Sequence, residues 1–231
     1  MTIRVLIFDV FGTLVDWRSG IAREVRALLG ERVPDPEVFA DDWRAQYQPA
    51  MEAVRSGALP FCKLDVLHRH NLDTVLAARG LHDAPEAVRA ELNLAWHRLD
   101  AWRDVTPGLR RLRERFRLAP CSNGNLSLMA DLARRNGFPW DAICGAELAR
   151  DYKPKPGVYL AACDAFDAPP DQVLMVAAHS SDLAAAAAAG LRTAFIARPD
   201  EKGPGLGESA ASVPVDHTAA GLLELADRLG A

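Results

Sequence analysis

The sequence has few cysteines, no excess of basic residues and no long apolar run. Its 4 cysteines lie far apart without a C-x-x-C pair, which excludes a zinc ribbon and a disulfide scaffold. Lysine and arginine total 27 against 31 aspartates and glutamates, a formal charge of −4. This balance excludes the overall basic field with which proteins hold nucleic acids or anionic membranes.

A membrane span and a secretory leader are not expected either. No apolar segment approaches the roughly 20 residues that cross a bilayer. The apolar start of the chain is interrupted by Arg4 and Asp9, unlike the order of charges and apolar residues in a secretory signal. We therefore expect a cytoplasmic protein with no membrane or nucleic-acid partner.

What the sequence does contain is typical of a folded globular protein. It has 231 residues, of which 49% are hydrophobic and 25% charged. This length suits one large domain, or a core with a smaller insertion.

Short apolar runs that end in polar residues are the main structural pattern. The first, Val5 to Phe8, stops at Asp9 before a Gly-Thr turn, and we interpret it as a buried parallel strand. Similar runs occupy residues 118–121, 173–176 and 193–196, and helical patterns occupy residues 109–117, 126–136, 158–166 and 182–189. This alternation predicts an α/β fold: a Rossmann-like parallel sheet, whose polar strand ends converge on one edge.

Residues 16–99 have a different pattern, with amphipathic helices predicted at 21–29, 36–56, 63–79 and 85–99 and no convincing buried strand. They interrupt the core just after its first strand. We therefore predict two domains, an α/β core of residues 1–15 and 100–231 and a helical cap of residues 16–99 over the strand ends. Residues 203–212, rich in Gly, Pro and Ser, are predicted to form a surface loop.

Candidate reactive residues lie at or near the predicted strand ends. Asp9 is either a turn former or a reactive carboxylate, which needs no base to activate it at neutral pH. Ser122 and Asn123 are predicted to cap the helix that begins near Leu126, where free N–H groups suit an anion. Lys153, in a proline-rich loop, is by composition alone either a solvated charge or a site residue.

Four segments in this order resemble the motifs of the haloacid dehalogenase superfamily. They are Asp9 to Asp16, Ser122 to Gly124, Asp151 to Pro156 and Met175 to Leu183. The resemblance extends along the whole chain, cap included. It implies that Asp9 is the nucleophile, and that Lys153 and Asp182 complete its charged surroundings.

The residue two positions after the nucleophile distinguishes branches of this superfamily. Phosphatases and mutases have a second aspartate there, which acts as acid and base, whereas this chain has Phe11. Phenylalanine cannot protonate a leaving alkoxide, and the remaining carboxylates are a lean set for Mg²⁺. An aromatic residue here resembles the L-2-haloacid (type II) dehalogenases.

Further positions agree with that family. Arg44 resembles its cap arginine, which receives the departing halide, and Phe61 resembles a cap aromatic of the same pocket. Thr13 and Tyr159 match a threonine and a tyrosine that bond around the nucleophile and the substrate carboxylate. The alternative for Arg44 is a solvated helix arginine.

The fourth motif departs from the usual pattern of that family, which has an asparagine where this chain has His179. The histidine has three open roles: it takes over the positioning role of the asparagine, acts as a base in the second step, or merely bonds Asp182. This version resembles a subgroup in which some members accept fluorinated acids.

The resemblance implies hydrolysis of short 2-haloalkanoic acids to 2-hydroxy acids through an ester on Asp9, with inversion at C2. It implies no metal and no organic cofactor, and a small-molecule substrate as partner; dimers are common in the family, so a homodimer is one expectation. The alternatives are a Mg²⁺-dependent phosphatase of the same superfamily and a non-catalytic binding protein that keeps the fold. The preferred halogen and the chain-length limit stay open.

Overall fold

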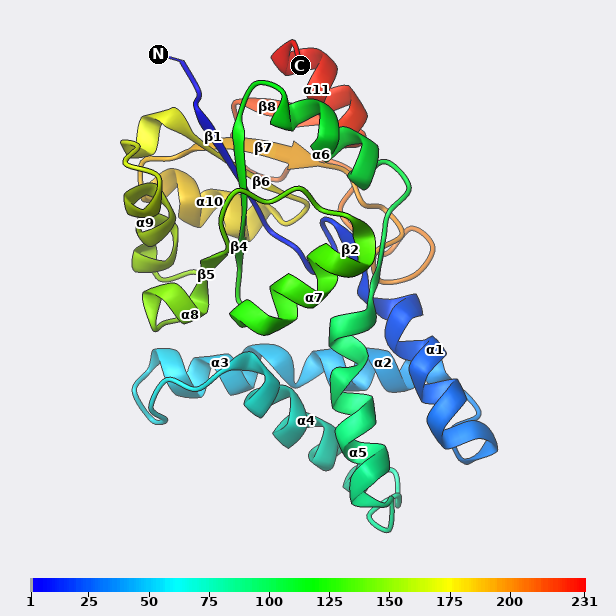
Figure 1. The fold of residues 1–231 in the computed structure, drawn as a ribbon. Helices are drawn as coiled ribbons and strands as arrows, with labels where there is room; N and C mark the ends of the chain where they lie inside the picture. The colour runs from blue at the N-terminus through cyan, green and yellow to red at the C-terminus, as the bar shows by residue number, and fades with distance from the viewer. Residues whose placement is uncertain (1) are drawn as a thin grey trace.

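The computed structural model describes residues 2–231, which fold into a parallel sheet with helices on both faces and further helices beyond the carboxyl end of β1 (Figure 1). The strand order is β5-β4-β1-β6-β7-β8, and every pair in this sheet is parallel. The strands are β1 (Val5–Phe8), β4 (Arg117–Ser122), β5 (Cys144–Gly145), β6 (Val173–Ala177), β7 (Arg192–Ile196) and β8 (His217–Ala219). The predicted α/β class is confirmed.

Alternation along β1 explains why both faces of the sheet are covered. Leu6 and Phe8 pack into one hydrophobic cluster and Val5 and Ile7 into another, because successive side chains of a strand point to opposite faces. The first cluster includes side chains of α6, α7 and α11, and the second those of α9 and α10. The core helices are α6 (Val105–Arg113), α7 (Leu126–Asn136), α8 (Ala146–Ala149), α9 (Pro156–Ala165), α10 (Ser180–Ala188) and α11 (Leu222–Leu229).

One core helix is shifted from its predicted range. We predicted a helix over residues 109–117, but α6 begins earlier, at Val105, and ends at Arg113. Arg117 already belongs to β4, because it pairs with Val5 of β1. Tertiary pairing at the edge of an element outweighs its helical propensity here.

Most of residues 16–99 are helical, as predicted. The helices are α1 (Trp17–Leu29), α2 (Pro36–Ala45), α3 (Tyr47–Arg55), α4 (Leu64–Ala78) and α5 (Glu86–Asn93), with short 3₁₀ turns at Gly30–Arg32 and Leu94–Arg98 and, in the core, at Pro170–Gln172. A two-stranded antiparallel ribbon of β2 (Val15–Asp16) and β3 (Asp100–Ala101) joins the two ends of this segment. The entry into the helical segment and the exit from it therefore lie side by side.

Two of the predicted helices in this segment are interrupted. The single helix predicted over 36–56 is wrong, since α2 and α3 are separated at Gln46. A continuous helix would need an N–H at Pro49, which proline lacks, whereas the first turn of α3 does not. The helix predicted over 85–99 ends at Asn93 and continues as the 3₁₀ turn.

Direct bonds hold the helical segment on the core near the strand ends. Tyr152 Oη donates to the Cys62 carbonyl at 2.8 Å, and Arg55 Nη1 donates to the Lys153 carbonyl at 2.9 Å. Both core partners, Tyr152 and Lys153, belong to the loop that carries the predicted lysine. The helical segment is thus tied directly to a candidate reactive residue.

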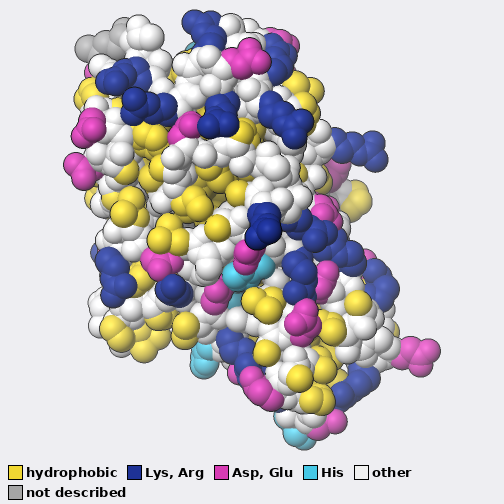
Figure 2. Space-filling view, viewed as in Figure 1, with side chains coloured by type: hydrophobic (Ala, Val, Ile, Leu, Met, Phe, Trp, Pro, Cys, Tyr) yellow, Lys and Arg dark blue, Asp and Glu magenta, His cyan; other side chains and the backbone are white. Residues whose placement is uncertain are grey.

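The four cysteines form no disulfide, and one face of the molecule carries charges of both signs. Cys62, Cys121, Cys144 and Cys163 are all free. On the face drawn in Figure 2, Lys and Arg side chains are interspersed with Asp and Glu side chains over both the α/β core and the helical segment. Among the described helices, none has the length and apolar character that crossing a bilayer requires.

Candidate active site

The candidate nucleophile lies directly after β1. Asp9 is 7% exposed, and its Oδ2 accepts a hydrogen bond of 2.7 Å from Thr13 Oγ1. The Thr13 hydroxyl in turn accepts from the backbone N–H of Ala178, just after β6, at 2.9 Å. The turn after β1 is thereby fixed to the neighbouring strand, and the carboxylate of Asp9 is held in one orientation.

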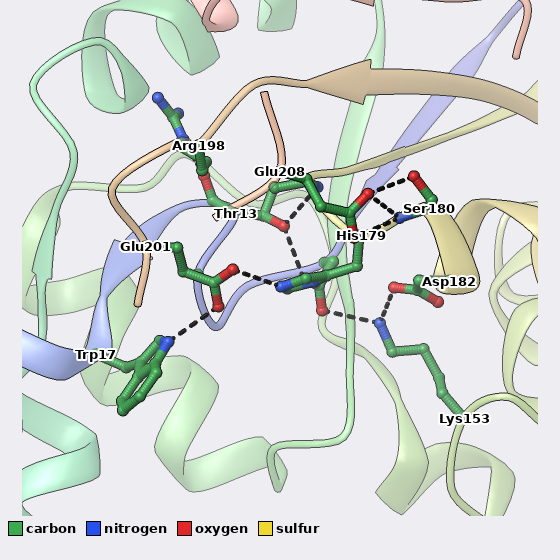
Figure 3. Close-up of polar contacts among 12 residues, drawn as sticks. Thr13, Trp17, Lys153, His179, Ser180, Asp182, Arg198, Glu201 and Glu208 are labelled. Carbon is green, nitrogen blue, oxygen red and sulfur yellow. Dashed lines mark hydrogen bonds and ion pairs between the residues drawn. The ribbon is translucent and has the colours of Figure 1, made fainter. Parts of the chain in front are cut away.

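An ammonium group lies between two carboxylates. Lys153 Nζ is 2.9 Å from Asp9 Oδ1 and 2.5 Å from Asp182 Oδ2 (Figure 3). The other oxygen of Asp182 accepts from Tyr159 Oη at 2.5 Å. Asn123 fixes the loop itself, because its Oδ1 accepts the backbone N–H of Lys153 at 2.8 Å. The structure therefore brings the predicted Asp9, Lys153, Asp182 and Tyr159 together.

These contacts set the charges of the site. Burial alone would raise the pKa of Asp9, but attraction to Lys153 and the hydrogen bond from His179 outweigh it and hold that pKa well below its usual range. Burial opposes the charge on Lys153, yet the two carboxylates keep its pKa well above the ordinary value. Asp9 is therefore an anion, and Lys153 a cation, throughout the range in which most enzymes work.

His179 lies between two carboxylates, one from each side. Its Nδ1 is 3.0 Å from Asp9 Oδ2, and its Nε2 is 2.9 Å from Glu201 Oε2 (Figure 3). Its position directly before α10 makes this possible. The open alternative in which His179 merely bonds Asp182 is wrong, because its ring nitrogens bond Asp9 and Glu201 instead.

An open cavity of about 820 Å³ lies over this array. Its walls include Asp9, Phe11, Arg44, Asn123, Tyr159 and His179, so residues of the core and of the helical segment share it. Phe11 supplies an apolar wall next to the nucleophile. A cavity of this size admits a small organic molecule.

Arg44 reaches the cavity from α2. Its guanidinium stacks on the Tyr47 ring, 4.0 Å from the centroid, and is 5.4 Å from that of Trp17. Its Nη1 is buried without a hydrogen-bond partner among the described residues. The solvated alternative for Arg44 is therefore wrong, and a cationic donor is available for an anion in the cavity.

The predicted cap of α7 is wrong. The N-cap residue is Asn125, and the first N–H of the helix, on Leu126, donates to Glu147 Oε2 at 2.7 Å. Ser122 Oγ instead accepts from the N–H of Gly124 at 3.0 Å. Asn123 is used by the lysine loop, and its Nδ2 lies 3.2 Å from Met51 Sδ. The sequence did not reveal that a distant glutamate satisfies this helix end.

Two predicted substrate contacts lie away from the cavity wall. Ser122 is fully buried. Phe61 packs on the Tyr152 ring, with 5.5 Å between the ring centroids. The guanidinium of Arg150 lies over the Phe61 ring, 4.7 Å from its centroid. Neither is among the cavity-lining residues of the described chain. Their roles in substrate binding stay predictions.

Metal ligation finds little support in this array. Within residues 2–231, no group of three or more His, Cys, Asp and Glu side chains is arranged to hold a metal ion. The space between the carboxylates of Asp9 and Asp182 is filled by the Lys153 ammonium.

Sequence reasoning missed Glu201 and its partner Trp17. Glu201 follows β7, the strand predicted at residues 193–196, and it is 2% exposed. Trp17 Nε1 donates to Glu201 Oε1 at 3.0 Å. The same signal that identified Asp9, a polar residue after a buried parallel strand, was present at Glu201. The signal was hard to see because four residues separate Glu201 from the end of β7, and because a glycine-rich loop follows it.

Several known proteins are similar to this chain in sequence and in fold. A family model described as haloacid dehalogenase-like hydrolase matches residues 3–190. The chain is similar to (S)-2-haloacid dehalogenase 1 of Pseudomonas sp. (strain CBS-3), with 29% identity over 199 residues and 85% of each chain covered.

Two solved structures are more similar. The crystal structure of the defluorinating L-2-haloacid dehalogenase Rha0230 has a TM-score of 0.94 and 44% identity, and the comparison covers 99% of this chain and 96% of that one. The crystal structure of the L-2-haloacid dehalogenase PA0810 has a TM-score of 0.93 and 46% identity, with 98% and 99% covered.

Proposed function

Because the chain belongs to the haloacid dehalogenase-like hydrolases, and among them to the L-2-haloacid dehalogenases, we propose that it hydrolyses short 2-haloalkanoic acids to 2-hydroxy acids. One observation carries the proposal. An ionised Asp9, paired to Lys153, faces a cavity whose wall at position 11 is phenylalanine rather than an acid. This arrangement favours displacement at carbon over protonation of a phosphate ester's leaving group.

Halide release tests this function directly. Chloride release from L-2-chloropropionate is expected, and no phosphate release from p-nitrophenyl phosphate with Mg²⁺. A phosphatase would show the reverse result, and a binding protein would release neither ion.

The first half-reaction is a displacement at C2. A carboxylate oxygen of Asp9 forms the bond to C2 while the carbon–halogen bond breaks, and the halide leaves toward the guanidinium of Arg44, which lines the cavity. Oδ2 of Asp9 already accepts two hydrogen bonds, from Thr13 and His179, whereas Oδ1 accepts one, from Lys153. Since each carboxylate oxygen has two in-plane lone pairs, Oδ1 is the oxygen that attacks.

The second half-reaction cleaves the ester at the carbonyl carbon of Asp9. Water adds to that carbon and gives a proton to Asp182, and the negative charge moves onto Oδ2. The bond from the carbon to Oδ1 then breaks, and Lys153, 2.9 Å from Oδ1, protonates the departing alkoxide. Asp182, 2.5 Å from Lys153 Nζ, returns the proton to the lysine, and Oδ1 leaves in the product. The second proton of the water is lost from Asp9 to solvent, which restores the carboxylate.

This sequence predicts the stereochemical course. Attack by Asp9 inverts C2 once, and water attacks the ester carbonyl without touching that centre. With the substrate carboxylate near Asn123 and the halogen toward Arg44, one enantiomer alone has its carbon–halogen bond in line with Asp9. L-2-chloropropionate should give D-lactate, with the D-substrate inert. Chiral chromatography measures this, and L-lactate or a racemate from the L-substrate would overturn single displacement at carbon.

Metal independence is a second prediction of the site. Lys153 supplies between Asp9 and Asp182 the positive charge that a phosphatase takes from Mg²⁺, and halide departure needs no bridging cation. Chloride release after treatment with EDTA should equal that of the untreated enzyme. Activity that returns only with added Mg²⁺ would contradict this and favour the phosphatase alternative.

The remaining expectations belong to the same proposal. Residues 16–99 act as a cap domain that brings Arg44 over the strand ends of the core. We also propose a cytoplasmic location and a homodimer, on the resemblance to the family.

A further inference from the structure

The motif resemblance places His179 where the usual pattern of the family has an asparagine. The imidazole has an acidic partner on each side. It bridges Asp9, directly after β1, and Glu201, on the loop after β7, so that one imidazole ring separates two buried carboxylates. Esterification removes the charge of Asp9 and leaves that of Glu201. The two carboxylates are therefore not equivalent during the reaction.

We propose that Glu201 is a positioning residue that keeps His179 an imidazolium through both half-reactions, so that His179 Nδ1 and Thr13 Oγ1 form the donor pair for the oxyanion on Asp9 Oδ2. The inference rests on the proposed dehalogenase function and deepens it. It makes His179 a hydrogen-bond donor to the ester carbonyl rather than the base that activates water.

Geometry assigns the two oxygens of Asp9 to different roles. Thr13 Oγ1 lies 2.7 Å from Oδ2 and His179 Nδ1 lies 3.0 Å from it, which are hydrogen-bond distances for a developing oxyanion. Because Oδ1 forms the bond to substrate, Oδ2 becomes the carbonyl oxygen of the ester. The same two donors then face the atom that gains negative charge when water adds.

The Glu201 carboxylate is held from several sides. Trp17 Nε1 donates to its Oε1 at 3.0 Å, and Gly12, with φ +84, leaves room for it. A Cβ at Gly12 would lie 2.1 Å from Glu201 Oε1, so a larger residue there would displace the carboxylate.

Arg198 fixes the start of the loop that carries Glu201. It pairs with both oxygens of Asp104 at 2.9 Å and donates from Nε to the Thr13 carbonyl at 2.9 Å. One arginine thus ties the loop of Glu201 to the turn that carries Thr13. The carboxylate and the donor pair are held in one frame.

The charges support the same assignment. Burial lowers the pKa of His179, but hydrogen bonds and attraction from Asp9 and Glu201 outweigh it and raise that pKa to about 10. Burial raises the pKa of Glu201, yet His179, Trp17 and Arg44 together keep it below its usual value. Of the other charged groups at the cavity, Lys153 pairs with Asp9 and Asp182, and Glu208 accepts hydrogen bonds from Ser180. Lys202 also lines the cavity. When Asp9 becomes an ester, Glu201 is the anion left in contact with the imidazolium.

Nuclear magnetic resonance of ¹⁵N-labelled histidine tests the charge without turnover. The Asp9→Asn variant carries a neutral amide that imitates the ester, and we expect both ring nitrogens of His179 to stay protonated in it at pH 8. In the double variant Asp9→Asn with Glu201→Gln, His179 should be neutral at that pH. A neutral ring in the single variant, or an imidazolium in the double variant, would overturn the proposal.

Rapid-quench kinetics test the role. In single turnovers of L-2-chloropropionate, chloride release reports the first step and decay of the protein ester the second. If His179 must be protonated, ester decay slows as pH rises through the pKa of His179. In Glu201→Gln this loss of rate should occur at a pH lower by at least about one unit, because the imidazolium has lost its anionic partner. His179→Leu, which has no hydrogen-bond donor, should slow ester decay by about 10²-fold while chloride release persists.

The outcomes separate the two levels of the proposal. Ester decay that accelerates as pH rises through the pKa of His179 would mean that His179 acts as a base. A pH profile of ester decay that is the same in Glu201→Gln as in the unaltered enzyme would mean that Glu201 does not keep His179 protonated. The absence of chloride release from the unaltered enzyme would instead overturn the dehalogenase function. Glu224→Gln, on the exposed face of α11, is the matched control and should leave both steps unchanged.

Discussion

Replacement of Asp9 by asparagine is expected to lower kcat on L-2-chloropropionate on the order of 10⁴-fold or more, as loss of a covalent nucleophile does in other enzymes. An amide has nearly the same shape but no anionic oxygen to displace the halide. The ion pair with Lys153 at 2.9 Å and the bond from Thr13 at 2.7 Å show that the carboxylate is already oriented, so no other group takes its place. Chloride release measures the loss.

Isotope labelling identifies the covalent intermediate independently. In a single turnover in ¹⁸O-water, the label should enter Asp9, because water attacks the carbonyl carbon and Oδ1 leaves in the product. Label found directly in the first-turnover product, or substantial turnover by Asp9→Asn, would refute the nucleophile assignment. Asp164→Asn, at an exposed position on α9, is the matched control and should keep full activity.

The core of the fold could be predicted because its strands are buried on both faces. Residues 5–8 and 173–176 are continuous apolar runs in buried strands, and a polar site residue follows each of them within three positions, Asp9 and His179. The short edge strands β5 and β8 escaped prediction. With 2 and 3 residues, they are strands only because a neighbour supplies the pairing.

The site was predictable wherever its residues follow directly from a strand or a motif. Asp9, Lys153 and Asp182 come from separate segments, and the convergence of strand ends brings them together. Glu201 was not predicted, because its importance depends on a tertiary contact with His179 across the sheet edge. The hydrogen bond from the first N–H of α7 to Glu147 was not predicted for the same reason, since no local sequence pattern relates Glu147 to this helix end.

Replacement of Lys153 by methionine is expected to lower kcat by about 10³-fold, because it removes the proton donor to the departing alkoxide and leaves two facing carboxylates without their shared cation. Methionine keeps much of the length of the lysine chain, so packing in the loop changes little. Chloride release and ester decay, measured by rapid quench, should both slow, since the ammonium contacts Asp9 in the free enzyme and its Oδ1 in the ester. Lys63→Met, at an exposed residue of the helical segment, is the matched control.

The pH dependence distinguishes this effect from simple misfolding. In the unaltered enzyme Lys153 helps to hold the pKa of Asp9 well below its usual range, so the nucleophile stays ionised in weak acid. Without the ammonium, burial raises that pKa, and a raised pKa leaves part of Asp9 protonated and unreactive as pH falls. The residual activity of Lys153→Met should therefore rise with pH across the acid range where the unaltered enzyme is flat. A variant that keeps more than about a tenth of the activity, or whose activity shows no acid limb, would mean that His179 alone is enough to keep Asp9 ionised.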